Sequence, residues 1–317
     1  MEFHEEEDFP RLPFQKAASL RAVSLSTSCN PVAGNAPSPN ILWKRDTMEH
    51  HTLETLRIEG DGPVRHLVLD RPSLLNAINA RMLEDITDAC HLLGRDPEVR
   101  VVVLRGEGRC FSAGADLKEG VIGQAKAGGL AHRARLGQMA VNALAELAPV
   151  TIAAVHGHVI GGGSCLAAAC DFRIAADTAR VCVLESRLGI SLSWNSVPNF
   201  VHLVGPSRAK EMIMFGEVHE PQVLEQWGYF NKVVPEGELL AAVDTLAGKV
   251  LAQPPFPVEM AKTSINAMVK ALDRAIFHQD PYGLALTASL DDATLSRERL
   301  AAEKEGGPVP APDWKRE

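Results

Sequence analysis

Apolar residues in the middle of the chain occur in two patterns, short continuous runs and a spacing of three to four residues. The short runs predict buried β-strands over residues 66–69, 101–104, 150–155, 172–175, 181–184 and 232–234. The wider spacing predicts helices over residues 82–93 and 130–147, and a short apolar helix that ends at Cys170. Strands that alternate with helices over the first two thirds of the chain indicate an α/β fold.

The last third of the chain changes to a mainly helical pattern. Pro254 and Pro255 mark a break in that pattern. The segments 257–273 and 281–304 predict helices that pack either on another part of the chain or on another subunit. We therefore expect a core domain followed by a helical C-terminal region, with domain bounds at residues 48–253 and 254–317.

Residues 1–47 differ from the rest because they hold clusters of Ser, Pro and Asn and no sustained apolar period. This composition predicts a disordered N-terminal extension. Met48 stands just before the first patterned segment and is an alternative start of the protein. A small capping segment is the other interpretation, because Phe14, Leu20, Ile41 and Trp43 are available to dock on the core.

Composition narrows the classes of partner. The chain has 317 residues and a formal net charge of −8, which argues against nucleic acid as a main partner. No apolar run reaches the roughly 18 residues that span a bilayer, so we expect no membrane segment. The acidic N-terminus does not resemble a signal peptide, and the six cysteines form no CxxC pair and no zinc-ligand cluster. We expect a cytoplasmic protein with reduced thiols and no metal.

Two glycine-rich loops are the first candidates for chemistry. Ser112–Asp116 follow one predicted strand, and Gly161–Gly163 follow another and open the short helix. Glycine lets the backbone approach a ligand closely, and a helix start presents unpaired N–H groups that suit an oxyanion developing on a carbonyl. Tight turns that let strands pack on helices explain the same glycines, and the spacing alone favours that simpler interpretation.

An ordered set of short motifs resembles one protein family. The motifs are R-P-S-L-L-N-A-I at 71–78, F-S-A-G-A-D-L-K-E at 111–119, A-A-V-H-G through G-G-G at 153–163, C-D-F-R-I-A at 170–175, L-E-S-R-L-G-I at 184–190 and W-G-Y-F-N-K-V-V at 227–234. Each motif is weak alone. In this order they resemble the crotonase superfamily, the enoyl-CoA hydratase/isomerase family, over roughly residues 53–300.

The resemblance implies a crotonase-like spiral of ββα units and a helical C-terminal region that trimerises, which gives a trimer or a dimer of trimers. It implies an acyl-CoA thioester as substrate, with its carbonyl oxygen in an oxyanion hole formed by the N–H groups of Ala115 and Gly162. It also places seven residues along the CoA, namely Ser73, Leu74, Leu75, Ala113, Asp116, Leu117 and Lys118.

Two of the residues along the CoA need comment. Many relatives have Lys where this chain has Ser73, so one cation that faces the phosphates is missing. Lys118 either meets phosphate charge or is a solvated lysine at the start of a helix.

The carboxylates that family members use to transfer a proton indicate which residue does so in this chain. Two-acid hydratases have one Glu where this chain has Cys165, and a second Glu that corresponds to Glu185. A thiol with an ordinary pKa of ~8.5 is mostly neutral near neutral pH, so we interpret Cys165 as a small residue that lines the pocket. Ser193 stands where dienoyl isomerases and aryl-CoA dehalogenases have an Asp, which excludes the dehalogenase nucleophile. Glu185 remains as the only acid of the site.

Four neighbouring side chains have two interpretations each. Trp194 either walls the acyl pocket or fills the core. Asn195 either bonds a polar acyl tail or caps the helix that follows, and we favour the cap. His156 and His158 lie beside the second glycine loop, where we interpret them as structural residues rather than general bases.

Together these inferences predict an enzyme of the enoyl-CoA hydratase/isomerase type, a lyase or isomerase of fatty acid metabolism. The oxyanion hole would stabilise a thioester enolate while Glu185 moves a proton in a hydration or a double-bond shift of an enoyl-CoA, without a metal or redox cofactor. The alternatives on the same fold are a hydroxycinnamoyl-CoA hydratase-lyase, an acyl-CoA decarboxylase and a thioester hydrolase. An inactive scaffold that binds acyl-CoA is the alternative from another class.

Overall fold

The structure, a computed structural model, describes residues 53–116, 127–271, 273 and 280–305. All of these residues belong to one unit, Asp46–Glu317. The predicted extension over residues 1–47 lies outside the described residues, and so do Leu117 and Lys118.

Two sheets form the frame of this unit. The larger sheet has the order β1-β2-β3-β4-β6-β9, made of β1 (Leu56–Glu59), β2 (Val64–Leu69), β3 (Val101–Gly106), β4 (Val150–Val155), β6 (Phe172–Ala176) and β9 (Lys232–Val234). In it β1 runs antiparallel to β2, and the other neighbouring pairs are parallel. The smaller sheet has the order β5-β7-β8, made of β5 (His158–Ile160), β7 (Arg180–Cys182) and β8 (Val218–His219).

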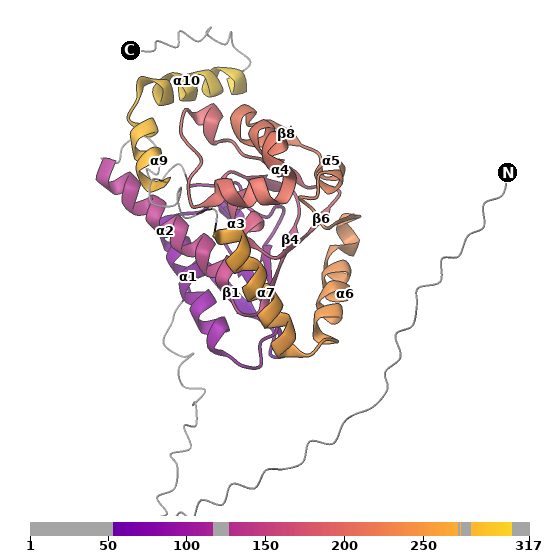
Figure 1. Ribbon diagram of the computed structural model, residues 1–317. Coiled ribbons are helices and arrows are strands. Elements are labelled where there is room, and N and C mark those ends of the chain that lie inside the picture. The colour runs from indigo at the N-terminus through magenta and orange to yellow at the C-terminus, as the bar shows by residue number, and fades with distance from the viewer. Residues whose placement is uncertain (1–52, 117–126, 272, 274–279, 306–317) are drawn as a thin grey trace, which may run out of the picture. The chain divides into compact units, whose positions relative to one another are not determined.

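The helices cover both faces of the larger sheet. They are α1 (Ala80–Arg95), α2 (Ala127–Glu146), α3 (Gly162–Ala169), α4 (Ser196–Phe215), α5 (Pro221–Gln226), α6 (Leu239–Leu251), α7 (Pro255–Lys270), α9 (Asp280–Ala288) and α10 (Asp291–Glu305), with short 3₁₀ turns η2 (Pro72–Leu74), η4 (Glu185–Leu188) and η5 (Glu236–Glu238). Figure 1 shows α1 and α2 side by side, with α6 across the strands from them.

Strand β3 lies between two hydrophobic cores, and this position explains why its sequence is apolar without alternation. Val102 and Leu104 face the larger core, which α1, α2, α3 and α4 complete. Val101 and Val103 face a second core under α6. Because successive side chains of a strand point to opposite faces, both sets are buried only when helices cover both sides of the sheet.

Three loops meet beyond the C-terminal ends of the parallel strands. The buried Asn76 side chain holds the loop after β2 to the loop after β3, because its amide donates to the carbonyls of Cys110 and Phe111 at 3.0 and 3.2 Å. Ser112 in turn pairs with Val159 of β5 in a parallel bridge. The glycine-rich loops of the sequence therefore lie side by side.

The pattern-based elements agree with the structure in most places and differ in a few. The run over 181–184 forms a strand only to Cys182, because the chain turns into η4 directly after Leu184. The segment 281–304 is two helices rather than one, with a break at Ser289 and Leu290. Of the two packing alternatives for this segment, the structure places α9 against α2 and α10 against η4 of the same chain.

Candidate active site

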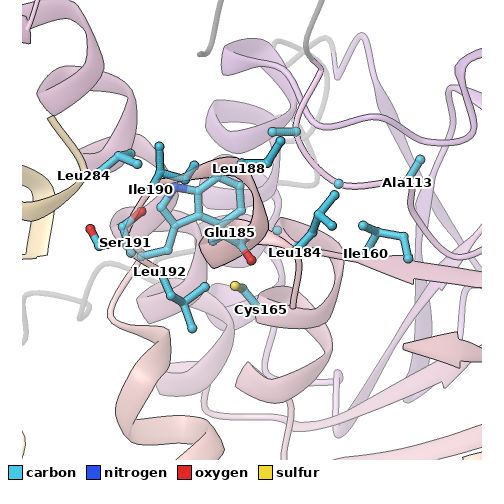
Figure 2. A pocket seen from close by; sticks show the side chains of 16 residues that line it. Ala113, Ile160, Cys165, Leu184, Glu185, Leu188, Ile190, Ser191, Leu192 and Leu284 are labelled. Atoms are coloured by element: carbon cyan, nitrogen blue, oxygen red, sulfur yellow. The ribbon is translucent and has the colours of Figure 1, made fainter. Parts of the chain in front are cut away.

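A cavity of about 90 Å³ lies where the three loops meet. It is lined by the loop Ala113–Ala115, the turn Ile160–Gly162, Cys165 of α3, most of the segment from Leu184 to Trp194 and, from α9, Leu284. In Figure 2, Ala113 and Ile160 lie toward one end and Leu284 and Ser191 toward the other, with Glu185 and Cys165 between them. Most of the lining is apolar, so the polar groups in the middle determine what the cavity can do.

Two residues of the lining, Ala115 and Gly162, have backbone N–H groups that their neighbouring strands and helix leave unused. Ile78 pairs with both residues that flank Ala115, since the Ile78 N–H donates to Gly114 O and the Asp116 N–H to Ile78 O. In such a bridge the N–H of the central residue, here Ala115, points to the other side. Gly162 is the first residue of α3, whose N–H has no partner within the helix. Within the described residues, neither N–H donates to a backbone carbonyl of a turn or loop.

The two loops pack so closely that only glycine fits at position 114. Its φ is +85°, and a Cβ there would lie 2.6 Å from the carbonyl oxygen of Ile160. The same Cβ position is 3.7 Å from the nitrogen of Gly162. The loop that carries Ala115 is thus in contact with the start of α3, and Ala115 and Gly162 line the same cavity.

Glu185 begins η4 and lies against the second glycine loop. A Cβ on Gly161 would come within 2.9 Å of Glu185 Oε1, so the carboxylate packs directly on the backbone before Gly162. Its Oε2 is buried and has no hydrogen-bond partner among the described residues. Burial raises the pKa of Glu185 to about 7, although a backbone N–H bond opposes part of the rise. A carboxyl group with this pKa can both accept and return a proton near neutral pH.

Cys165 lies on α3 next to this carboxylate. The side chain is buried, and burial together with the charge of Glu185 raises the pKa of the thiol well above its usual value. The thiol is therefore neutral where Glu185 titrates, and it cannot act as a second base. The structure places Cys165 in the lining of the cavity.

Trp194 forms a wall of the cavity, and it is also buried. Its backbone is left-handed, with φ +65°. A Cβ on Gly162 would come within 2.5 Å of its ring, and one on Gly137 of α2 within 2.1 Å. The indole therefore fills the space between α2 and α3 and also lines the cavity, so the interpretations of Trp194 as a core residue and as a pocket wall are not exclusive.

Asn195 takes the predicted position but not the predicted bond. It is the N-cap residue of α4, yet its side chain makes no capping hydrogen bond to the helix. Instead Oδ1 accepts from Gln138 Nε2 at 2.8 Å, and Nδ2 donates to Asn142 Oδ1 at 3.3 Å. The prediction of a side-chain cap is wrong, because the left-handed backbone at Asn195 turns its side chain toward α2.

The residues predicted along the CoA occupy different places in the structure. Ala113 lines the cavity. Ser73 and Leu74 are exposed in η2, outside the cavity lining. The Leu75 carbonyl accepts from the Ala113 N–H at 2.9 Å, which joins η2 to the cavity loop. Asp116 is buried and forms an ion pair with Arg71 at 3.0 Å. Leu117 and Lys118 lie outside the described residues.

The two histidines lie away from the cavity lining. His156 Nε2 is 2.9 Å from the carbonyl oxygen of Gly108, and His158 is exposed on β5. Neither lines the cavity, in agreement with their structural interpretation. The described residues include no group of three or more His, Cys, Asp or Glu side chains that could hold a metal ion. None of the helices in the described ranges is both long and apolar enough to cross a bilayer.

The sequence analysis did not assign several of the lining residues to the site. Leu188, Ile190 and Leu192 follow Glu185 closely and look like ordinary core residues. Leu284 comes from a helix about a hundred residues further along, and only the packing of α9 on α2 brings it to the cavity. An apolar residue in an apolar helix cannot be told from a core residue by its spacing alone.

Comparison with known proteins gives one consistent result. Residues 59–304 match the family model described as enoyl-CoA hydratase/isomerase. Two curated relatives are a crotonyl-CoA hydratase of Syntrophomonas wolfei, 33% identical over 73% of this chain and 89% of its own, and a short-chain-enoyl-CoA hydratase of Clostridium acetobutylicum, 32% identical over 73% and 89%. A Thermobifida fusca protein, solved in complex with acetoacetyl-CoA, is 32% identical and covers 70% of this chain and 93% of its own, with a TM-score of 0.61.

Proposed function

Because the chain belongs to the enoyl-CoA hydratase/isomerase family of the crotonase superfamily, and has its fold, we propose that it shifts the double bond of an enoyl-CoA. The enzyme family and the acyl-CoA class of substrate follow from that membership. The finer proposal is that one carboxylate, Glu185, carries the proton between the α- and γ-carbons of a 3-enoyl-CoA.

One observation carries this proposal, namely that the cavity holds a lone acid of suitable proton affinity. Among the described residues that line the cavity, Glu185 is the one carboxylate, and burial raises its pKa to about 7. Cys165 stands at the position of the second acid and is a neutral thiol. A double-bond shift needs one group that takes a proton and gives it back, and this is what the site provides.

The proposed mechanism uses the backbone donors and the acid together. The thioester carbonyl oxygen accepts hydrogen bonds from the N–H groups of Ala115 and Gly162. Glu185 removes a proton from the α-carbon, and the negative charge moves to the carbonyl oxygen, where the two donors stabilise it. The same carboxyl group then returns the proton to the γ-carbon, which leaves a conjugated 2-enoyl-CoA and restores the enzyme.

Hydration of a 2-enoyl-CoA is the second candidate, and the names of the curated relatives favour it. In this reaction Glu185 activates a water molecule, which adds to the β-carbon. The α-carbon then has to receive a proton that originates from that water, since no second carboxylate lines the described cavity. The same two donors would stabilise the same enolate.

The CoA portion is proposed to lie outside the cavity, along η2 and the loop after β3. The exposed Ser73 and Leu74 support this path, because η2 is joined through Leu75 to Ala113, which lines the cavity. Asp116 contributes to this path by positioning Arg71, with which it forms an ion pair. The contribution of Lys118 to phosphate binding remains a proposal from the sequence.

A panel of substrates separates the candidates. We expect a 3-enoyl-CoA to gain conjugated thioester absorbance without a change in mass, and a 2-enoyl-CoA to lose little of it. Loss of absorbance with a gain of one water in mass would instead identify a hydratase. Release of free CoA, of carbon dioxide or of an aldehyde from an aryl substrate would identify the hydrolase, decarboxylase or hydratase-lyase. Binding across the panel without turnover would contradict enzymatic activity and leave the scaffold.

A further inference from the structure

A second, smaller cavity of about 20 Å³ lies next to the first and shares lining residues with it. Both cavities are lined by Ala115, Trp194 and Leu284. The rest of the second cavity belongs to the start of α1 and to α2, with the lining residues Ile78, Asn79, Ala80, Leu83, Leu130, Arg133 and Ala134. Its volume holds about one water molecule. The side chains of Trp194 and Leu284 thus separate two spaces, and together they are called the partition below.

The tryptophan of the partition is held on both faces. Its ring contacts the backbone of Gly162 on α3 and of Gly137 on α2 so closely that a Cβ at either glycine would overlap it. Trp194 and Asn195 both have left-handed backbone conformations, with φ of +65° and +55°. Such a pair of residues persists only when its surroundings fix it.

Asp280, the first residue of α9, provides that fixation. Its carboxylate accepts hydrogen bonds from the backbone N–H groups of both Trp194 and Asn195, the latter at 3.2 Å. Gln138 Nε2 lies 3.3 Å from the same carboxylate and 2.8 Å from Asn195 Oδ1. Leu284 follows Asp280 by one helical turn, so α9 both holds the tryptophan and supplies the second side chain of the partition.

Of the two partition residues, Leu284 lies toward the end of the cavity away from Ala113, while the Trp194 ring packs on Gly162, beside the proposed place of the thioester. The donors Ala115 and Gly162 and the acid Glu185 fix the place of the thioester and of the carbons next to it. Ala113, on the proposed side of the CoA, lies toward the opposite end from Leu284 in Figure 2. A chain that extends from the thioester toward Leu284 therefore runs along Trp194, and the partition lies between it and the second cavity.

We propose that Trp194 and Leu284 set an upper limit on the length of the acyl group, and that the second cavity is closed to substrate while the partition is intact. This inference rests on the proposed function, because it takes the first cavity as the acyl site. It assigns Asp280 a positioning role, since its carboxylate touches the wall and not the reacting atoms.

Calorimetric binding of saturated acyl-CoAs, from butanoyl to decanoyl, tests the limit without needing turnover. In the wild type each added methylene should strengthen binding by up to about fourfold until the chain meets the partition, after which the gain stops. In Trp194→Ala the gain should continue to longer chains, so that decanoyl-CoA binds at least about tenfold more tightly than to the wild type. Leu284→Ala removes fewer atoms than Trp194→Ala, so it should raise the limiting chain length in the same direction by a smaller amount.

Leu83→Ala is the matched control, because Leu83 lines only the second cavity. Alone it should leave the limiting chain length unchanged, and combined with Trp194→Ala it should tighten decanoyl-CoA binding further. The proposal is overturned if wild-type affinity rises through decanoyl-CoA without a break, or if folded Trp194→Ala and Leu284→Ala proteins both keep the wild-type limit. If the wild type binds no acyl-CoA at all, the proposed function itself is contradicted. If it binds acyl-CoAs but shows no limit on chain length, only the length limit is wrong.

Discussion

At the scale of single residues, the surroundings of Glu185 decide its chemistry. The family motif predicted that this residue carries the proton, but the motif says nothing about proton affinity. The rise of its pKa to about 7 comes from burial against Gly161, which precedes it by 24 residues. Neither the burial nor the unpartnered Oε2 can be read from the sequence, because both depend on how β5, α3 and η4 pack.

The raised pKa of Glu185 predicts a pH-dependent stability. A carboxyl group with a folded pKa of about 7 and an ordinary value of 4.5 stabilises the fold when protonated. That contribution is complete below pH 4.5 and is lost as the pH rises through about 7. Glu185→Gln stays neutral, so its melting temperature relative to the wild type should increase between pH 5 and pH 8. The exposed Glu298→Gln controls for the removal of one charge, and a Glu185→Gln difference that is constant with pH would contradict the assignment.

A test of the oxyanion donor at Gly162 needs two variants that are compared with each other, because any side chain at this position meets the Trp194 ring. In the Trp194→Ala background, Gly162→Ala adds a Cβ and keeps the N–H, while Gly162→Pro adds one and removes the N–H. Proline is tolerated at the first position of a helix, so both proteins should fold. The Pro variant should have a kcat about 10²–10³-fold below that of the Ala variant. Equal rates in a steady-state assay would remove Gly162 from the oxyanion hole.

At the scale of elements, local pattern and long-range packing contribute differently. The runs that became β2, β3, β4, β6, β7 and β9 were predicted because apolar residues follow one another in each, and in β3 and β4 both faces are covered. The strands β1, β5 and β8 were missed, since they are only two to four residues long and carry charged or exposed side chains. The contribution of α9 to the site was missed because nothing local distinguishes Asp280 and Leu284 from other helical residues.

Asn76 connects the elements around the site and predicts a measurable loss. Its φ is +52°, and its buried side-chain amide donates to the carbonyls of Glu107, Cys110 and Phe111. Asn76→Ala leaves these groups without their donor and also disfavours the left-handed backbone. Urea unfolding should show a loss of at least about 2 kcal/mol. Asn76→Gly is the matched comparison, because it relieves the backbone and still lacks the amide; full stability in Asn76→Gly would show that the hydrogen bonds contribute little.

At the scale of the whole molecule, α7 exposes more apolar surface than a lone chain normally leaves in water. None of its residues is buried, and Phe256, Met260, Ile265 and Met268 are all exposed. Lys262 and Asn266 attach the helix to the carbonyls of Pro149 and Ala145. Exposed apolar side chains of this size favour association, so we propose that α7 contributes to the trimer or dimer of trimers expected from the family resemblance.

Light scattering at micromolar concentration tests this assembly. The wild type should have the mass of three or six chains. The double variant Ile265→Glu, Met268→Glu should shift toward single chains, because two charges would have to be buried in the interface. Val223→Glu places a charge at an exposed apolar residue of α5 and should leave the mass unchanged. A wild-type protein that remains a monomer would contradict the proposal.

The rate of the Glu185→Gln variant with a 3-enoyl-CoA tests the central claim most directly. The amide keeps the shape of the side chain but cannot take a proton. We predict that turnover, followed as the rise of conjugated thioester absorbance, falls by about 10²–10⁴-fold while acyl-CoA binding stays within about twofold of the wild type. Cys165→Ala, measured beside it, should remain active, since the neutral thiol carries no proton in the mechanism. A Glu185→Gln enzyme that retains wild-type turnover would contradict the account of a single acid in the cavity.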